Sequence, residues 1–281
     1  MPHAEQLFPV GLSLVAVVCW GTSDFTGGYA SKKSDAFVVT MLAHAGGLVL
    51  MTALALGWGA GFPPQSSRLW ALLAGALGGT ALAIFYRTLA AGNMGIAAPA
   101  AAVLAAAIPM ALGMIWQGLP GAAPLLGFVL AGTGIWLMAR PDASSGRPDG
   151  LVMALVAGLG FAGFFVCIHQ AGASSAIWLA ALSRLGSLVL VTSIVTFRWN
   201  FRIRLRDALL GVGAGCLDST GTMFFIRAQQ TGRLDSAVIV ASLYPAVTVL
   251  LARLILREHF TRWKAVGILA ALGAVPLIAM Q

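Results

Sequence analysis

Five ionisable side chains lie within segments that are otherwise apolar, and these residues are the ones best placed to do chemistry. They are Asp24, His44, His169, Arg184 and Asp218. An ionised group is costly in lipid, so such residues usually face a water-filled cavity or pair with one another. A carboxylate that alternates between a wet cavity, a cationic partner and a bound proton is what proton coupling requires. The sequence therefore predicts a polar cavity inside an apolar protein.

Asp218 is the first candidate for the coupling group. It lies in the middle of the apolar segment 205–229, roughly 18 Å from either end at 1.5 Å per residue, too far for its carboxylate to reach bulk water. One helical face carries Asp218, Thr222, Phe225 and Gln229. Arg184 is a candidate partner from another helix. Two interpretations stay open, a coupling site or a buried ion pair that only holds two helices together.

The other candidates also carry two interpretations each. Asp24 is either a cavity group or a helix-end carboxylate that reaches water. His44 and His169 are either proton carriers or satisfied core histidines. Tyr244, next to Pro245, is either an aromatic substrate contact or a packing residue at a kink. The predicted cavity for substrate and coupling ion comprises Asp24, Trp20, Asp218, Thr222, Arg184, Tyr244, Tyr86, His44 and His169.

Other kinds of site have no motif in the sequence. Cys19, Cys167 and Cys216 lie in apolar runs, without the spacing of metal ligands or a disulfide framework. The glycine-rich segments lie within apolar stretches, which is typical of helix packing rather than phosphate binding. No nucleophile lies next to a base. We therefore expect no cofactor, no metal, no ATP-driven pumping and no enzymatic activity.

Composition places the chain in a membrane. Of its 281 residues, 59% are hydrophobic and 9% are charged, and the mean hydropathy is +0.90. Soluble domains have about 25% charged residues, so lipid must be the solvent for this much apolar surface. The net charge of +8 comes from Lys and Arg in short loops, which argues against a nucleic-acid partner. The first apolar run, 7–29, is longer than the core of a signal peptide and is interpreted as a membrane helix.

The hydropathy pattern predicts an all-α polytopic protein with ten transmembrane helices. The expected spans are 7–29, 36–57, 68–91, 94–116, 122–139, 150–170, 175–197, 205–229, 234–256 and 262–280. The polar stretch 140–149 falls near the midpoint and separates five helices from five. Proline residues at 99, 109 and 245 predict broken helices at equivalent places in the two halves, and such paired breaks point to the substrate path.

A short internal repeat supports the division into halves. The segment Phe85–Gly92 recurs as Phe225–Gly232, at an offset of 140 residues. Five helices are an odd number, so a second copy enters the membrane in the opposite sense. The sequence therefore predicts two inverted repeats, residues 1–140 and residues 150–281.

Charge asymmetry predicts the orientation. Of the 17 Lys and Arg residues, thirteen lie at one side of the expected bundle, Arg68, Arg227 and Arg233 lie at the other, and Arg184 lies in the middle of a span. By the positive-inside rule the richer side is cytoplasmic, which places both termini outside the cell membrane.

A family resemblance emerges from several of these segments. The stretch Ala241–Arg253, followed by Leu256-Arg257-Glu258, resembles the second-half signature of EamA-type transporters in the drug/metabolite transporter superfamily. Trp20–Phe25 and Ala98–Pro109 are similar to first-half pieces. The resemblance implies ten helices in two inverted repeats around a central cavity, and transport of small metabolites. This chain departs from the family at Trp116-Gln117-Gly118-Leu119-Pro120, where Gly-Glu is common after the fourth helix, so the two corresponding loops need not act alike.

These observations predict a secondary transporter that moves a small metabolite or drug across the cell (inner) membrane by alternating access, either proton-coupled or facilitative. The alternative is a passive channel or lipid-handling protein with the same bundle. The expected partners are a small-molecule substrate, the lipid bilayer and, for coupled transport, protons. Either a monomer or a homodimer is compatible with the sequence.

Overall fold

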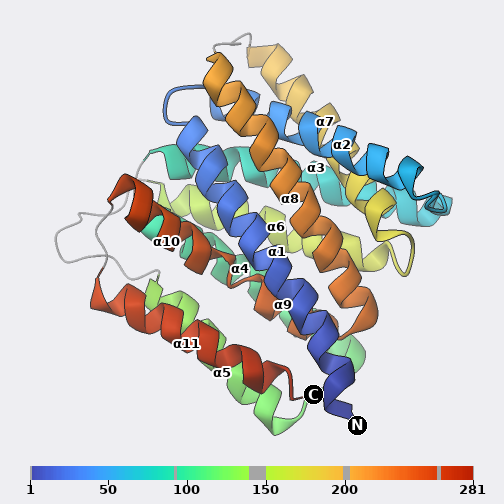
Figure 1. Ribbon diagram of the computed structural model, residues 1–281, viewed down its shortest axis with the longest axis vertical. Coiled ribbons are helices and arrows are strands. Elements are labelled where there is room, and N and C mark those ends of the chain that lie inside the picture. The colour runs from blue at the N-terminus through green and yellow to red at the C-terminus, as the bar shows by residue number, and fades with distance from the viewer. Residues whose placement is uncertain (1, 92–93, 139–149, 199–202, 258–260, 281) are drawn as a thin grey trace.

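All regular secondary structure in the described part of the chain is helical. The computed structural model describes residues 2–91, 94–138, 150–198, 203–257 and 261–280 (Figure 1). Its helices are α1 (Pro2–Ala30), α2 (Ala36–Gly57), α3 (Gln65–Ala90), α4 (Met94–Gln117), α5 (Ala122–Met138), α6 (Leu151–Gln170), α7 (Ala176–Arg198), α8 (Leu205–Thr231), α9 (Leu234–Ala241), α10 (Tyr244–Leu256) and α11 (Arg262–Ile278). The all-α class predicted from composition is therefore confirmed.

Most of the predicted spans correspond to single helices whose ends differ by only a few residues. Within the described residues, eight segments are long and apolar enough to cross a membrane, counting Leu234–Leu256 as one. The helices α5 and α11 have 17 residues each. At 1.5 Å per residue each is about 26 Å long, slightly less than a typical hydrocarbon core. The predicted linker 140–149 lies outside the described residues.

The predicted pairing of helix breaks is only half right. The second-half span is interrupted at Ser242-Leu243, between α9 and α10, with Pro245 in the first turn of α10. Proline has no N–H to continue the backbone ladder, and a turn closes instead, from Leu243 N to Val240 O at 3.0 Å. In contrast, α4 continues through Pro99 and Pro109 as one helix. A helix interior loses a single hydrogen bond at each proline, and the surrounding helices hold α4 together.

The helices pack in a regular scheme across the molecule. Helix α1 packs along α8, and α3 packs along both α6 and α7. Helix α2 contacts α7 and α8, α4 contacts α6, and α10 contacts α1. The pair α5 and α11 lies at one edge of the bundle (Figure 1). The centre is therefore enclosed by α1, α3, α4, α6, α7, α8 and the broken span α9–α10.

Glycines allow the closest of these contacts. A Cβ on Gly75 in α3 would overlap the carbonyl oxygen of Ser183 in α7, and a Cβ on Gly215 in α8 would overlap that of Ala43 in α2. The offset from Gly75 to Gly215 is 140 residues, and so is the offset from Ala43 to Ser183. The same close contact thus occurs twice, at the spacing of the sequence repeat.

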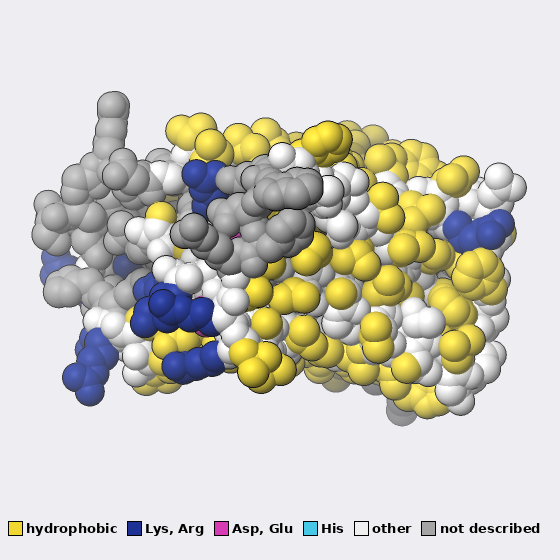
Figure 2. Space-filling view, turned by 90° about the horizontal axis from the view of Figure 1, so that it is seen from above, with side chains coloured by type: hydrophobic (Ala, Val, Ile, Leu, Met, Phe, Trp, Pro, Cys, Tyr) yellow, Lys and Arg dark blue, Asp and Glu magenta, His cyan; other side chains and the backbone are white. Residues whose placement is uncertain are grey.

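One end of the molecule carries most of the charge. Figure 2 shows Lys and Arg side chains gathered toward one end and hydrophobic side chains along the middle. The start of α1 and the end of α11 lie near each other at the opposite end (Figure 1). This arrangement agrees with an even number of crossings.

The end that holds the termini is fastened by Arg233. Its guanidinium forms an ion pair with Asp235 at 2.7 Å and donates to the carbonyls of Gln117 and Gly118. The side-chain oxygen of Gln117 accepts from Leu234 N at 2.9 Å. These bonds join the end of α4 to the start of α9. The neutral amide of Gln117 therefore takes part in the contact between the two helices.

Candidate functional site

A cavity lies at the centre of the bundle, between the two halves of the chain. Its walls are formed by Trp20, Asp24, Gly78, Leu82, Ala105, Phe161, Phe164, Phe165, Arg184, Ser187, Asp218, Thr222 and Tyr244. About 50 Å³ is open to the centre of a water-sized sphere. Pockets for drug-sized ligands are usually several hundred cubic ångströms. In this conformation the cavity therefore accommodates water or a compact solute.

Arg184 connects one wall of the cavity. It reaches from α7 to form an ion pair with Asp218 of α8, and its Nη2 donates to Thr222 Oγ1 at 3.1 Å. Its Nη1 lies 3.4 Å from Nδ1 of His44 in α2. Because a guanidinium only donates, this ring nitrogen must accept, and the His44 imidazole is then neutral. The Arg184 partner predicted for Asp218 is thus confirmed.

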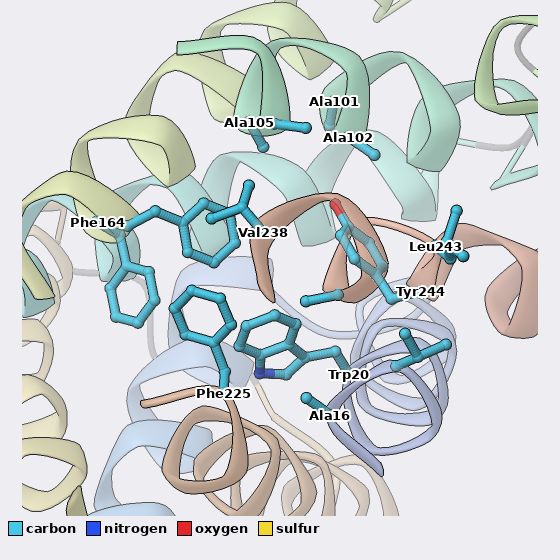
Figure 3. Packing of buried hydrophobic residues seen from close by; sticks show 14 of the residues in the cluster. Ala16, Trp20, Ala101, Ala102, Ala105, Phe164, Phe225, Val238, Leu243 and Tyr244 are labelled. Carbon is cyan, nitrogen blue, oxygen red and sulfur yellow. The ribbon is translucent and has the colours of Figure 1, made fainter. Parts of the chain in front are cut away.

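Aromatic side chains form the opposite wall. The indole of Trp20 donates to the backbone oxygen of Asp218 at 3.1 Å, which ties α1 to α8. Figure 3 shows its ring between those of Phe225 and Tyr244, at centroid distances of 5.4 and 6.3 Å. Phe165 of α6 lies 5.8 Å from the same indole. Helices from both halves of the chain therefore meet around Trp20.

Asp24 is the exceptional polar group of the cavity. It lies one helical turn from Trp20 on α1, and 6% of its surface is exposed. Within the described residues its carboxylate has no hydrogen bond or ion pair, although the charge of Asp218 is close enough to act on it. An isolated buried carboxylate is costly, so it must bind a proton or a cation when the cavity is dry.

Two further buried atoms of the cavity walls have no hydrogen-bond partner among the described residues. They are Oη of Tyr244 and Nε of Arg184. The break between α9 and α10 places Tyr244 at the start of a helix, with its carbonyl oxygen so near Gly21 that a Cβ there would come within 2.6 Å. The break between α9 and α10 thus places Tyr244, with its hydroxyl group, on the same cavity wall as Asp24.

The predicted site residues divide into three groups. Six of them line the cavity, namely Asp24, Trp20, Asp218, Thr222, Arg184 and Tyr244. Tyr86 and His44 lie one layer behind. The Tyr86 hydroxyl bonds Ser23 Oγ at 3.1 Å, next to Asp24 in the chain, and His44 bonds Arg184. His169 lies elsewhere and stacks on Trp116, with ring centroids 5.3 Å apart.

Several wall residues were not singled out by the sequence. Phe161, Phe164 and Phe165 come from α6, and Ser187 follows Arg184 by one turn of α7. Three phenylalanines in an apolar helix resemble ordinary lipid-facing residues, so composition alone gives no signal for them. Their common face in the segment Phe161–Phe165 becomes informative only when α6 is placed beside α1 and α8.

The cavity walls have a simple charge balance. Arg184 neutralises Asp218 through the ion pair, and Asp24 adds one further acidic group. The site can therefore hold one proton or one positive charge at Asp24. It provides aromatic faces but no group of three or more His, Cys, Asp or Glu side chains that could hold a metal, within the part of the chain that the structure describes.

Comparisons with known proteins agree with this architecture. Residues 149–280 match the EamA-like transporter family. Among the solved structures that match is one described only as a crystal structure of a protein, with a TM-score of 0.71 at 16% identity over 96% of this chain and 95% of that chain. At that identity the likeness shows the fold alone. No curated protein matches the chain. The family match over the second half of the chain, together with the apolar helices, supports a multi-pass transmembrane transporter of the EamA-like type.

Proposed function

We propose that this protein is a proton-coupled secondary transporter that moves a small solute by alternating access. The observation that carries the proposal is Asp24, a buried carboxylate on the cavity wall with no bonding partner in the part of the chain that the structure describes. Such a group binds a proton when the cavity closes and releases it when water or a substrate enters. Asp218 was the first candidate from the sequence, but its ion pair with Arg184 favours a role in organising the site.

Two inverted repeats, residues 1–140 and 150–281, provide the moving parts in this proposal. The packing scheme supports them, because exchanging α1–α5 for α6, α7, α8, α9–α10 and α11 turns the α1–α8 contact into the α6–α3 contact. It also turns the α3–α7 contact into the α8–α2 contact. The twin glycine contacts at Gly75 and Gly215 follow the same rule. Related repeats that exchange conformations open a central site to each side of the membrane in turn.

In this scheme the polar and the aromatic residues of the cavity walls have different roles. The Arg184 ion pair keeps Asp218 and Thr222 in place on α8. Trp20 and Tyr244 join α1 to α8 and α10 at the level of Asp24. Substrate entry between these rings displaces the closed packing and exposes Asp24 to water. Loss of its proton then links substrate movement to the proton gradient.

Transport in proteoliposomes tests the proposal. The purified protein is reconstituted into liposomes. The uptake of amino acids, nucleosides and amines is then measured one solute at a time, with and without a pH gradient. A coupled transporter concentrates its substrate when the gradient is present. We expect Asp24→Asn to abolish this accumulation, because the amide is nearly isosteric but binds no proton. Exchange of labelled for unlabelled substrate should persist at concentrations that saturate the variant, since exchange requires no net proton movement.

Asp207→Asn is the matched control. Asp207 is a buried carboxylate near the charged end that accepts from Ser34 Oγ at 2.7 Å and is not among the cavity walls. Its variant should accumulate substrate at the wild-type level. Undiminished accumulation in Asp24→Asn would refute the coupling role of Asp24. Flux that never exceeds the equilibrium concentration would identify the passive channel instead.

A further inference from the structure

We infer that the cavity selects a compact organic ammonium ion, a protonated amine that keeps at least one N–H group. This inference rests on the proposed function and specifies its substrate class. It depends on three features of the described cavity walls: their charge, their unused hydrogen-bonding atoms and their aromatic faces. Each feature excludes a different class of solute.

The charge of the walls excludes anions. The ionisable groups of Asp, Glu, Lys and Arg type that line the cavity are Asp24, Asp218 and Arg184. The ion pair uses the only cation among them, so an arriving carboxylate or phosphate would meet Asp24 without a free positive partner. A single positive charge on the solute neutralises Asp24 and replaces the proton that the closed cavity otherwise needs.

The unused polar atoms favour an ammonium ion that carries N–H groups. Among the described residues, the Asp24 carboxylate accepts no hydrogen bond, and the buried Oη of Tyr244 has no partner. The two groups line the same cavity. A protonated amine can donate to both oxygens, whereas a quaternary ammonium ion has no N–H to give. Charge-assisted hydrogen bonds of this kind are about twice as strong as neutral ones.

The remaining walls favour a cation with an apolar body. The aromatic rings of Trp20, Phe165 and Tyr244 surround the space beside Asp24, and Phe161 and Phe164 extend this wall along α6. Cations are attracted to aromatic faces, most strongly where water is excluded. The small open volume then limits the body to a compact group, and a ring enters only when the walls move apart. A large amphipathic drug would require a wider cavity.

Calorimetric binding to the purified full-length protein tests this selectivity with ligands of one shape. Benzylamine is a cation with N–H groups at neutral pH, benzyl alcohol is its neutral analogue, and phenylacetate is an anion. Benzyltrimethylammonium is a cation without N–H groups. We expect benzylamine to bind about ten- to a hundredfold more tightly than benzyl alcohol, as a hydrogen-bonded charge predicts. Benzyltrimethylammonium should be weaker than benzylamine, and phenylacetate should not bind.

Two variants locate the selectivity at the cavity. Asp24→Asn should remove the preference for benzylamine and leave benzyl alcohol binding unchanged, whereas Tyr244→Phe should weaken benzylamine by about tenfold, the value of one hydrogen bond to a charged group. Asp207→Asn should change neither affinity. Equal binding of benzylamine and benzyl alcohol by the wild type, or a preference for phenylacetate, would overturn the inference.

Binding and transport fail separately in this design. Amine-selective binding without accumulation under a pH gradient would refute the coupling proposal and keep the substrate class. Gradient-driven accumulation of a neutral or anionic solute, with no amine binding, would keep the coupling proposal and refute the substrate class.

Discussion

Arg184 connects two helices at the centre of the protein through bonds to three side chains. It bonds Asp218 and Thr222 of α8 and His44 of α2, and only 5% of its own surface is exposed. Removing one partner of a buried ion pair leaves the other charge uncompensated, which costs more than the pair itself contributes. The site therefore depends on Arg184 as a neutralising group before any substrate binds.

This dependence predicts the behaviour of Arg184 variants. Arg184→Met should lower the free energy of unfolding by about 3 kcal/mol, because Asp218 is left as an unpaired buried charge. The double variant Arg184→Met with Asp218→Leu should recover most of that loss. The measurement is unfolding of the detergent-solubilised protein, arranged as a double-mutant cycle. Additive losses in the double variant would show that the two side chains are not coupled.

The residue scale also shows what the sequence could and could not reveal. Asp218 and Arg184 were predictable partners because each lies in the middle of an apolar span and needs the other. The solitary state of Asp24 was not predictable, since α1 could equally have carried it to water at a helix end. Its isolation follows from the packing of α1 against α8 and α10, which depends on contacts far apart in the chain.

At the scale of the elements, two glycines of α8 differ in how closely a neighbouring helix approaches them. Gly215 of α8 lies against the backbone of Ala43 in α2, whereas Gly213 has open space where a Cβ would lie. Close approach of this kind is how helices associate in lipid, where the hydrophobic effect does not drive them together. The two residues therefore form a matched pair for substitution.

We expect Gly215→Ala and Gly213→Ala to differ in sign. The first should destabilise the protein by about 1–3 kcal/mol, because the added methyl group forces α2 and α8 apart. The second should be neutral or stabilising by up to about 1 kcal/mol, because alanine is the better helix former. Thermal unfolding of both variants in the same detergent is the measurement. Equal effects in the two variants would contradict the close packing of α8 on α2.

Helix boundaries were largely predictable, and one helix break was not. Apolar runs of membrane-spanning length define their own ends, so span 36–57 and the outer limits of 234–256 coincide with the structure. Proline alone did not decide which span breaks, because α4 absorbs two prolines and α9–α10 opens before one. The difference lies in the neighbours, since the carbonyl of Tyr244 is held against Gly21 and the Thr248 hydroxyl bonds Gly21 O at 3.1 Å.

At the scale of the whole molecule, the uneven distribution of positive charge is the dominant surface feature. Lys and Arg side chains gather at the end opposite the termini (Figure 2). Short loops rich in these residues are retained in the cytoplasm during insertion. The predicted orientation, with both termini outside, follows from this asymmetry and remains a prediction.

Cysteine labelling in intact cells measures the orientation. In a background without Cys19, Cys167 and Cys216, a cysteine at Gln65 should react with a membrane-impermeant thiol reagent. A cysteine at Lys33 should react only after the membrane is permeabilised. Both positions are exposed, so labelling of both after permeabilisation is the control for reactivity. The reverse pattern in intact cells would place the termini in the cytoplasm.

The Arg233 contacts have a consequence for the kinetics of a carrier. They connect α4 to α9 at the end that holds the termini, whereas the start of α4, 140 residues before the start of α9, follows the uncharged sequence Ala90-Ala91-Gly92-Asn93. A network worth about 1–3 kcal/mol on one side shifts a two-state equilibrium by roughly 5- to 150-fold. Under alternating access the empty carrier would then rest with its cavity facing the charged side. Half-saturation would require different substrate concentrations on the two sides of the membrane, and Arg233→Gln would bring the two values together.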